Sequence, residues 1–244
     1  MRRFLRENGL SLTMLGLFAI TIVGQAAAGI REYNQSQLEH GEPTVALLQY
    51  LASGHFIEAV FENWESEFLQ MTAFVVLSAM LYQKGSPESK SLDEPEPVDA
   101  DPRLSRKRPG APWPVRRGGL VLQLYERSLG IALFLLFAIS FALHAVGGAR
   151  EYSAEQLAHG GEAVSTLAYL TTSRFWFESL QNWQSEFLSV GALVLLTIFL
   201  RQRGSPQSKP VAAPHGETGE GGEEESRPEP PRRRRRGAGR PAAA

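Results

Sequence analysis

The chain has 244 residues, no cysteine and a formal net charge of −1, with 25 Lys and Arg residues against 26 Asp and Glu residues. The lack of cysteine excludes disulfides, thiolate chemistry and cysteine-based metal sites. Apolar blocks alternate with polar, proline-rich segments, so the average hydropathy says nothing about the class of the protein and the blocks decide it.

The first apolar block covers residues 10–30, after a short basic start, and a similar block covers residues 128–149. Each holds about 21 or 22 residues without Lys, Arg, Asp or Glu, which is the length a helix needs to cross roughly 30 Å of hydrocarbon. Both blocks are therefore predicted to span a membrane.

A cleaved secretory signal is the competing interpretation of the first block. Arg2 and Arg3 precede the block, and Ala26 to Ala28 resemble a small-residue cleavage site. The block at 128–149 lies in the middle of the chain and matches the first, so we favour an uncleaved span.

The segments 31–62 and 150–181 follow the two spans, and each has about 32 residues, longer than a usual connection. Apolar residues recur in both at helical spacing, which predicts amphipathic helices that lie on the membrane or cap the bundle. Gly41 and Gly160 are predicted to stop short helices that start near Gln35 and Ala154.

Two shorter apolar blocks, at 68–82 and 187–200, suit a membrane span, a buried helix or a re-entrant segment. Asn63 and Asn182 are good N-cap residues just before them. Helices that start after these asparagines and reach Gln83 and Gln202 would have about 20 residues, roughly 30 Å. We therefore predict spans at 64–83 and 183–202.

Residues 91–119 and 210–244 are rich in proline and charge and are predicted to form a disordered cytoplasmic linker and tail. In each, an acidic stretch precedes a basic one, which in the tail contains Arg232 to Arg236. The basic stretches suit loose contact with anionic lipid headgroups. No aromatic residue interrupts the arginine run and no folded module surrounds it, so no specific nucleic acid is expected.

The chain repeats itself. Residues 6–90 align onto 125–209 without a gap at a constant offset of 119, with roughly 36 of about 85 positions identical. The shared strings are R-E-Y, Q-L-x-H-G, N-W-x-S-E-F-L and Q-x-G-S-P-x-S-K. The predicted fold is an all-α membrane protein with four transmembrane helices in two parallel tandem repeats, 1–90 and 120–209.

The basic residues predict the orientation of the spans. In this layout 22 of the 25 lie on the side of the termini and linker, leaving Arg31, Arg150 and Arg174 on the other. Both termini are therefore predicted to be cytoplasmic. Each repeat has an even number of spans, so the repeats share one orientation and an inverted-repeat transporter is disfavoured.

Polar residues in the outer half of the spans are the first candidates for a site. Gln25 and His144 occupy the same repeat position, where polar groups in hydrocarbon need partners. We expect them to face each other as an interhelical hydrogen bond; the alternative is a proton or solute relay. Arg31 with Glu67, and Arg150 with Glu186, are expected to form ion pairs at the outer boundary, or else to line a polar vestibule.

The remaining candidates are aromatic and metal-binding side chains. Trp64 and Trp183 are expected at headgroup level, and Phe175 and Trp176 in an outer contact surface with Phe56, Phe61 and Phe177. His40 and His159 are weak candidates for metal ligands, because a site needs three or four ligands at suitable spacing. No cofactor, metal or catalytic motif is predicted, so an enzyme is the least supported class.

The shared strings, together with P-W-P-V-R-R-G-G-L in the linker, make residues 1 to about 215 resemble a family of bacterial four-span membrane proteins known only as a domain of unknown function. The resemblance implies an inner-membrane location and no activity. The leading functional hypothesis is a structural or interaction protein of the cell envelope. Its partners would be lipid and a second copy or another membrane protein; the alternative is a small-solute or ion channel or transporter acting as an oligomer.

Overall fold

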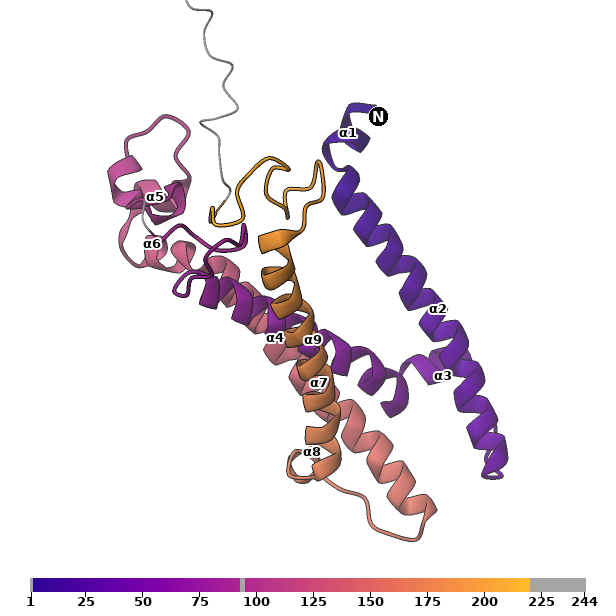
Figure 1. The fold of residues 1–244 in the computed structure, drawn as a ribbon. Helices are drawn as coiled ribbons and strands as arrows, with labels where there is room; N and C mark the ends of the chain where they lie inside the picture. The colour runs from indigo at the N-terminus through magenta and orange to yellow at the C-terminus, as the bar shows by residue number, and fades with distance from the viewer. Residues whose placement is uncertain (1, 93–94, 220–244) are drawn as a thin grey trace, which may run out of the picture. The chain divides into compact units, whose positions relative to one another are not determined.

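The computed structural model describes residues 2–92 and 95–219, and every regular element in this part of the chain is a helix (Figure 1). The all-α prediction is confirmed. The helices are α1 (Arg2–Glu7), α2 (Gly9–Glu39), α3 (Leu47–Leu51), α4 (Gly54–Ser78), η1 (Pro97–Asp99), η2 (Pro102–Ser105), α5 (Trp113–Arg117), α6 (Gly119–Glu126), α7 (Ser128–Ala158), α8 (Thr166–Tyr169) and α9 (Ser173–Phe199). They belong to two compact units, Met1–Val76 with Ser105–Val190 and Leu77–Leu104 with Gly191–Ala244.

Helices α2 and α7 each have 31 residues and are long and apolar enough to cross a membrane. They run past the predicted span ends through the R-E-Y string, so the short helices expected from Gln35 and Ala154 are instead the last turns of the long ones. No proline or glycine interrupts the chain there. The predicted stops are confirmed: both helices end just before Gly41 and Gly160, whose φ angles are 75° and 76°.

Helices α4 and α9 start about ten residues earlier than the N-cap signals indicated. Asn63 and Asn182 lie inside these helices, where their side-chain amides donate to the carbonyls of Ala59 and Glu178 at 2.9 and 3.0 Å. Their predicted N-cap role is wrong, because a side chain that can cap a helix can also bond back to the preceding turn.

The early start changes the composition of these two helices. Glu58, Glu62 and Glu65 fall in the first half of α4, and the helix ends at Ser78, short of the predicted Gln83. Helix α9 likewise ends at Phe199, short of Gln202. Among the described residues, two helices and not four are therefore apolar enough to span a membrane.

The segments after α2 and α7 form a short helix followed by the start of the next long one. The tyrosines of the two short helices, Tyr50 in α3 and Tyr169 in α8, are both fully buried. Each lies against a glycine of the preceding long helix: a Cβ on Gly29 would clash with the Tyr50 hydroxyl, and one on Gly148 would lie 2.5 Å from the Tyr169 ring. The core continues from Tyr169 to Phe175, Ala145 and Ala149.

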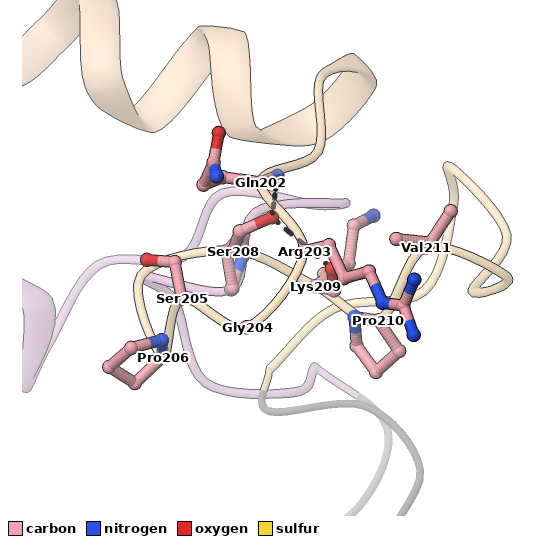
Figure 2. Close-up of a pocket in the computed structure, with 10 residues that line it drawn as sticks. Gln202, Arg203, Gly204, Ser205, Pro206, Ser208, Lys209, Pro210 and Val211 are labelled. Carbon is pink, nitrogen blue, oxygen red and sulfur yellow. Dashed lines mark hydrogen bonds between the residues drawn. The ribbon is translucent and has the colours of Figure 1, made fainter.

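The Q-x-G-S-P-x-S-K strings form matching turns in the second unit. The hydroxyl of Ser89 accepts a hydrogen bond from the backbone N–H of Gln83 at 2.8 Å, and that of Ser208 from Gln202 at 2.9 Å. Gly85 and Gly204 have φ angles of 86° and 85°, which favour glycine. Figure 2 shows the second turn, whose residues line a pocket. The repeated letters thus specify a repeated local structure.

The linker and tail were expected to lack order. Most of the linker 91–119 is described and contains η1, η2 and α5. In the tail 210–244, the Lys209 ammonium donates to the carbonyls of Pro214, His215 and Glu217. Residues 220–244, with the arginine run, lie outside the described part of the chain.

Candidate functional site: a buried charged cluster

The centre of the site is a pair between His144 on α7 and Glu65 on α4. The Nδ1 atom of His144 lies 2.7 Å from Oε2 of Glu65, and both side chains are 0% exposed. The other carboxylate oxygen of Glu65 accepts a hydrogen bond of 2.9 Å from the indole N–H of Trp183 on α9. Three helices are thus joined through one buried carboxylate.

A second carboxylate, the partly buried Glu178 on α9, is also held at both of its oxygens. Its Oε2 atom accepts a 2.5 Å hydrogen bond from the hydroxyl of Tyr169, and its Oε1 atom accepts one of 2.8 Å from Nε of Arg174. Arg174 also pairs with Glu155 on α7. The Tyr169 hydroxyl lies 3.3 Å from Oε1 of Glu58, so three acidic residues surround this tyrosine and arginine.

His144 connects the two halves of the cluster. Its Nε2 atom lies 3.5 Å from Oε2 of Glu178 and has no hydrogen-bond partner. One face of the imidazole stacks on Phe175, with ring centroids 4.9 Å apart, and Phe141 meets the edge of Phe175. Aromatic rings therefore cover a group of ionisable side chains, and an unpaired charge there would be costly.

Burial and neighbouring charges give the two carboxylates next to Tyr169 different pKa values. Burial raises the pKa of Glu58 to about 8, and the negative charge of Glu178 adds to the shift. Burial also acts to raise the pKa of Glu178, but interactions with His144, Tyr169 and Arg174 outweigh it and lower that pKa. At neutral pH Glu58 is therefore mostly protonated while Glu178 is ionised.

The structure gives His144 a different partner from the predicted one. Its partner is Glu65, whereas Gln25 lies exposed on α2 and makes no hydrogen bond among the described residues. The expected Gln25–His144 pair is wrong, since the α4 carboxylate meets the imidazole instead.

The predicted boundary ion pairs are also absent from the described part of the chain. Arg31 does not pair with Glu67, and Arg150 does not pair with Glu186; both arginines and Glu67 are exposed. Arg174 forms ion pairs instead, a largely exposed one with Glu155 and a partly buried one with Glu178. It sits one helical turn before Glu178, so the two meet on one face of α9.

The aromatic candidates divide into buried and exposed groups. Phe175 is fully buried beneath His144, so its predicted place in an outer contact surface is wrong. Trp176 is 42% exposed, and its indole N–H donates to the carbonyl of Leu170. Trp64 packs against Phe18 and Phe61, whereas Trp183 supports Glu65.

The weak metal candidates do not form a site. His40 and His159 are exposed, and the Nδ1 atom of each lies 2.8 Å from the carbonyl oxygen four residues earlier, at Ser36 and Glu155. They close the C-terminal turns of α2 and α7. Among the described residues, the metal-compatible group is instead Glu58, His144 and Glu178.

The acidic members of the cluster were missed, although the sequence holds a signal for them. Glu58, Glu62 and Glu65 stand at positions i, i+4 and i+7, which places them on one face of a helix. That signal becomes visible only when the helix is known to start at Gly54, because the predicted start after Asn63 put Glu58 and Glu62 in a separate outer helix.

The comparison with known families agrees with the repeated strings. Residues 1–220 match the domain of unknown function DUF6766. The chain belongs to this family. The predicted resemblance to a domain of unknown function is thereby confirmed, and the match includes every residue of the buried cluster. No curated protein and no solved structure matches the chain.

Proposed function

We propose that the chain is a multi-pass protein of the bacterial inner membrane, with four spans in two tandem copies and cytoplasmic termini. Its insertion is supported by α2, a 31-residue apolar helix without a single buried residue, whose side chains need lipid or another helix to cover them. The tandem arrangement is supported by helix starts at Gly9 and Ser128, and at Gly54 and Ser173, which share the offset of the sequence repeat.

Cysteine labelling tests the number of spans, because the chain has no cysteine of its own. Single variants Glu42→Cys, Arg103→Cys, Glu162→Cys and Ser205→Cys would be exposed in intact spheroplasts to a membrane-impermeant maleimide. Four spans predict labelling at 42 and 162 only. Labelling at 42 and 103, with protection at 162 and 205, would mean that α2 and α7 alone cross the membrane and would overturn the proposal.

We infer a structural or interaction role for the protein in the cell envelope. The support for this inference is that central side chains of the cluster are buried and bonded to one another. His144, Glu65 and Tyr169 are bonded to other side chains and fully buried, so the cluster acts as a clasp between α4, α7, α8 and α9. Next to it, Trp176 and Phe177 remain exposed. They offer a contact surface to a second copy or another membrane protein.

Site-specific photocrosslinking in cells tests the contact surface. A benzophenone amino acid at Phe177 is expected to capture a protein partner, either a second copy or another envelope protein. The same probe at Phe187, an exposed position on the later part of α9, serves as the control and should face lipid. Equal protein capture at both positions, or none at 177, would contradict the assigned surface.

A channel or transporter is the second candidate function, and the unpaired Nε2 atom of buried His144 favours it, because ionisable groups inside membranes commonly serve ion or proton pathways. Purified protein in liposomes would be assayed for proton and ion flux, with His144→Ala and the surface control His159→Ala. Flux abolished by the first variant alone supports transport. Absence of flux in the wild-type protein excludes it.

A further inference from the structure

Three side chains of the buried cluster bring possible metal-ligand atoms close together. Glu58 from α4, His144 from α7 and Glu178 from α9 each offer one atom, and the three atoms lie within 4.8 Å of one another. Carboxylate oxygen and imidazole nitrogen are common ligands of divalent transition metals. The ligand types are therefore suited to a metal ion.

The orientation of His144 is an independent observation that points to a ligand. Its Nδ1 atom faces Oε2 of Glu65 at 2.7 Å, and Trp183 holds the other oxygen of that carboxylate. With the ring proton on Nδ1, the lone pair lies on Nε2, which is buried and without a hydrogen-bond partner. Histidines that bind metals typically donate their other N–H to a carboxylate in this way.

A simple ion pair between His144 and Glu178 accounts poorly for the position of the Nε2 atom. Its nearest carboxylate oxygen, Oε2 of Glu178, is 3.5 Å away, beyond the usual length of a hydrogen bond, and already accepts a bond of 2.5 Å from Tyr169. Two ligand atoms that bind one tetrahedral Zn²⁺ at about 2.1 Å lie about 3.4 Å apart. The separation of 3.5 Å between Nε2 of His144 and Oε2 of Glu178 thus matches the distance between two ligand atoms of such a site.

The charges of the cluster also match a divalent cation. Metal binding would displace the proton that Glu58 carries at neutral pH. With Glu58 ionised and His144 neutral, the carboxylates of Glu58, Glu65 and Glu178 face the single permanent positive charge of Arg174. Two negative charges then remain in a buried environment, where they need a counterion. One divalent ion neutralises both.

We propose that Glu58, His144 and Glu178 bind one divalent transition-metal ion, with Zn²⁺ as the best match to one nitrogen and two oxygen ligands. Glu65 orients His144, and Arg174 holds the non-ligating oxygen of Glu178, so both act as positioning residues. Three protein ligands leave a fourth position, which the Tyr169 hydroxyl or a water molecule would fill. This proposal does not depend on the number of membrane spans.

Zinc binding to the full-length chain in detergent tests the proposal, after removal of metals with a chelator. Calorimetry and elemental analysis after dialysis are expected to give one Zn²⁺ per chain. His144→Gln, which places at this position the residue of the first repeat, and Glu58→Gln should weaken binding more than about 100-fold, and Glu65→Gln about 10- to 100-fold. His159→Gln, the surface control, should leave binding unchanged. No binding in wild-type protein, or wild-type affinity in both His144→Gln and Glu58→Gln, overturns the proposal.

A spectroscopic measurement on wild-type protein keeps the test decisive if the variants fail to fold. X-ray absorption of the zinc-loaded chain is expected to show a first shell with one imidazole nitrogen and oxygen ligands. A shell without imidazole would indicate a carboxylate site on the surface, and a shell with two imidazoles would indicate other histidines such as His40 and His159. Either result would overturn the assignment.

Discussion

His144 and Glu65 lie 79 positions apart in the chain, yet Nδ1 of one is 2.7 Å from Oε2 of the other, and neither side chain is exposed. The pair joins α7 of the second repeat to α4 of the first. Removing one partner of a buried pair is more damaging than removing a surface pair, because the remaining charge keeps its desolvation penalty without compensation.

Glu65→Gln should therefore destabilise the metal-free chain by about 3 kcal/mol, a fall in Tm of roughly 6–12 °C. Thermal unfolding in detergent, followed by circular dichroism, measures the change. Glu67→Gln is the matched control, since this exposed glutamate lies two residues along the same helix. It should change stability by less than about 0.5 kcal/mol. Equal effects of the two variants would contradict the central role of Glu65.

Gly148→Ala should destabilise the fold by about 1–3 kcal/mol, because the added Cβ would lie 2.5 Å from the ring of buried Tyr169. Gly24→Ala serves as the control, as nothing lies within 4 Å of its added Cβ. That change should stabilise the helix by about 0.5–1 kcal/mol, as alanine usually does in place of a helical glycine. Opposite shifts in Tm are expected, and a neutral Gly148→Ala would show that the tyrosine can move away.

Trp183→Phe removes the indole N–H that donates to Glu65, and should cost about 1–3 kcal/mol because the buried carboxylate loses a charge-assisted bond. Trp64→Phe changes the matching residue of the first repeat, whose indole makes ring contacts with Phe18 and Phe61 and no hydrogen bond among the described residues. Its effect on Tm should be smaller. If both variants unfold at the same temperature, the indole bond contributes little.

The metal-free chain should lose stability as the pH rises from 5 to 8. Glu58 has a folded-state pKa of about 8 against an ordinary value of 4.5, so between these values the folded chain keeps a proton that the unfolded chain has lost. The stability that this group contributes is complete below pH 4.5 and is lost as the pH approaches 8. The lowered pKa of Glu178 acts below pH 4.5 and does not alter this window.

Glu58→Gln carries no titrating proton, and it should remove much of this loss when Tm is measured at pH 5, 6, 7 and 8. Glu42→Gln, at an exposed position after α2, is the control and should leave the slope of the wild-type chain unchanged. Parallel curves for the wild-type chain and Glu58→Gln would mean that another group titrates.

The repeat comparison indicated where the cluster lies without identifying its members. Gln25 against His144, and His55 against Arg174, are positions where the two copies differ in polar chemistry. In the structure both residues of the second copy belong to the cluster, while His55 lies 3.4 Å from Glu32 in the first. A difference between copies marks a place where the surroundings differ, but it does not name the partner.

Helix starts were predicted poorly for a local reason. Asn63 and Asn182 have the residue type of an N-cap, but the residues before them already favour a helix, so each asparagine amide bonds to the carbonyl four residues back. The helical turns before these asparagines, which the prediction left out of α4 and α9, contain Glu58, Arg174 and Glu178. An error of about ten residues at a helix start thus hid half of the cluster.

The sequence by itself determined the all-helical fold class, the two long apolar helices, their stops at Gly41 and Gly160, and the family, because these depend on local composition, periodicity and glycine conformation. Only the tertiary structure decided that His144 meets Glu65 rather than Gln25, that Phe175 is buried, and that Glu58, Tyr169, Arg174 and Glu178 share one site. These contacts join α4, α7, α8 and α9 across long stretches of chain. The pattern of residues along one helix shows which of its faces is polar. Which face of another helix that polar face contacts is decided by the packing between helices.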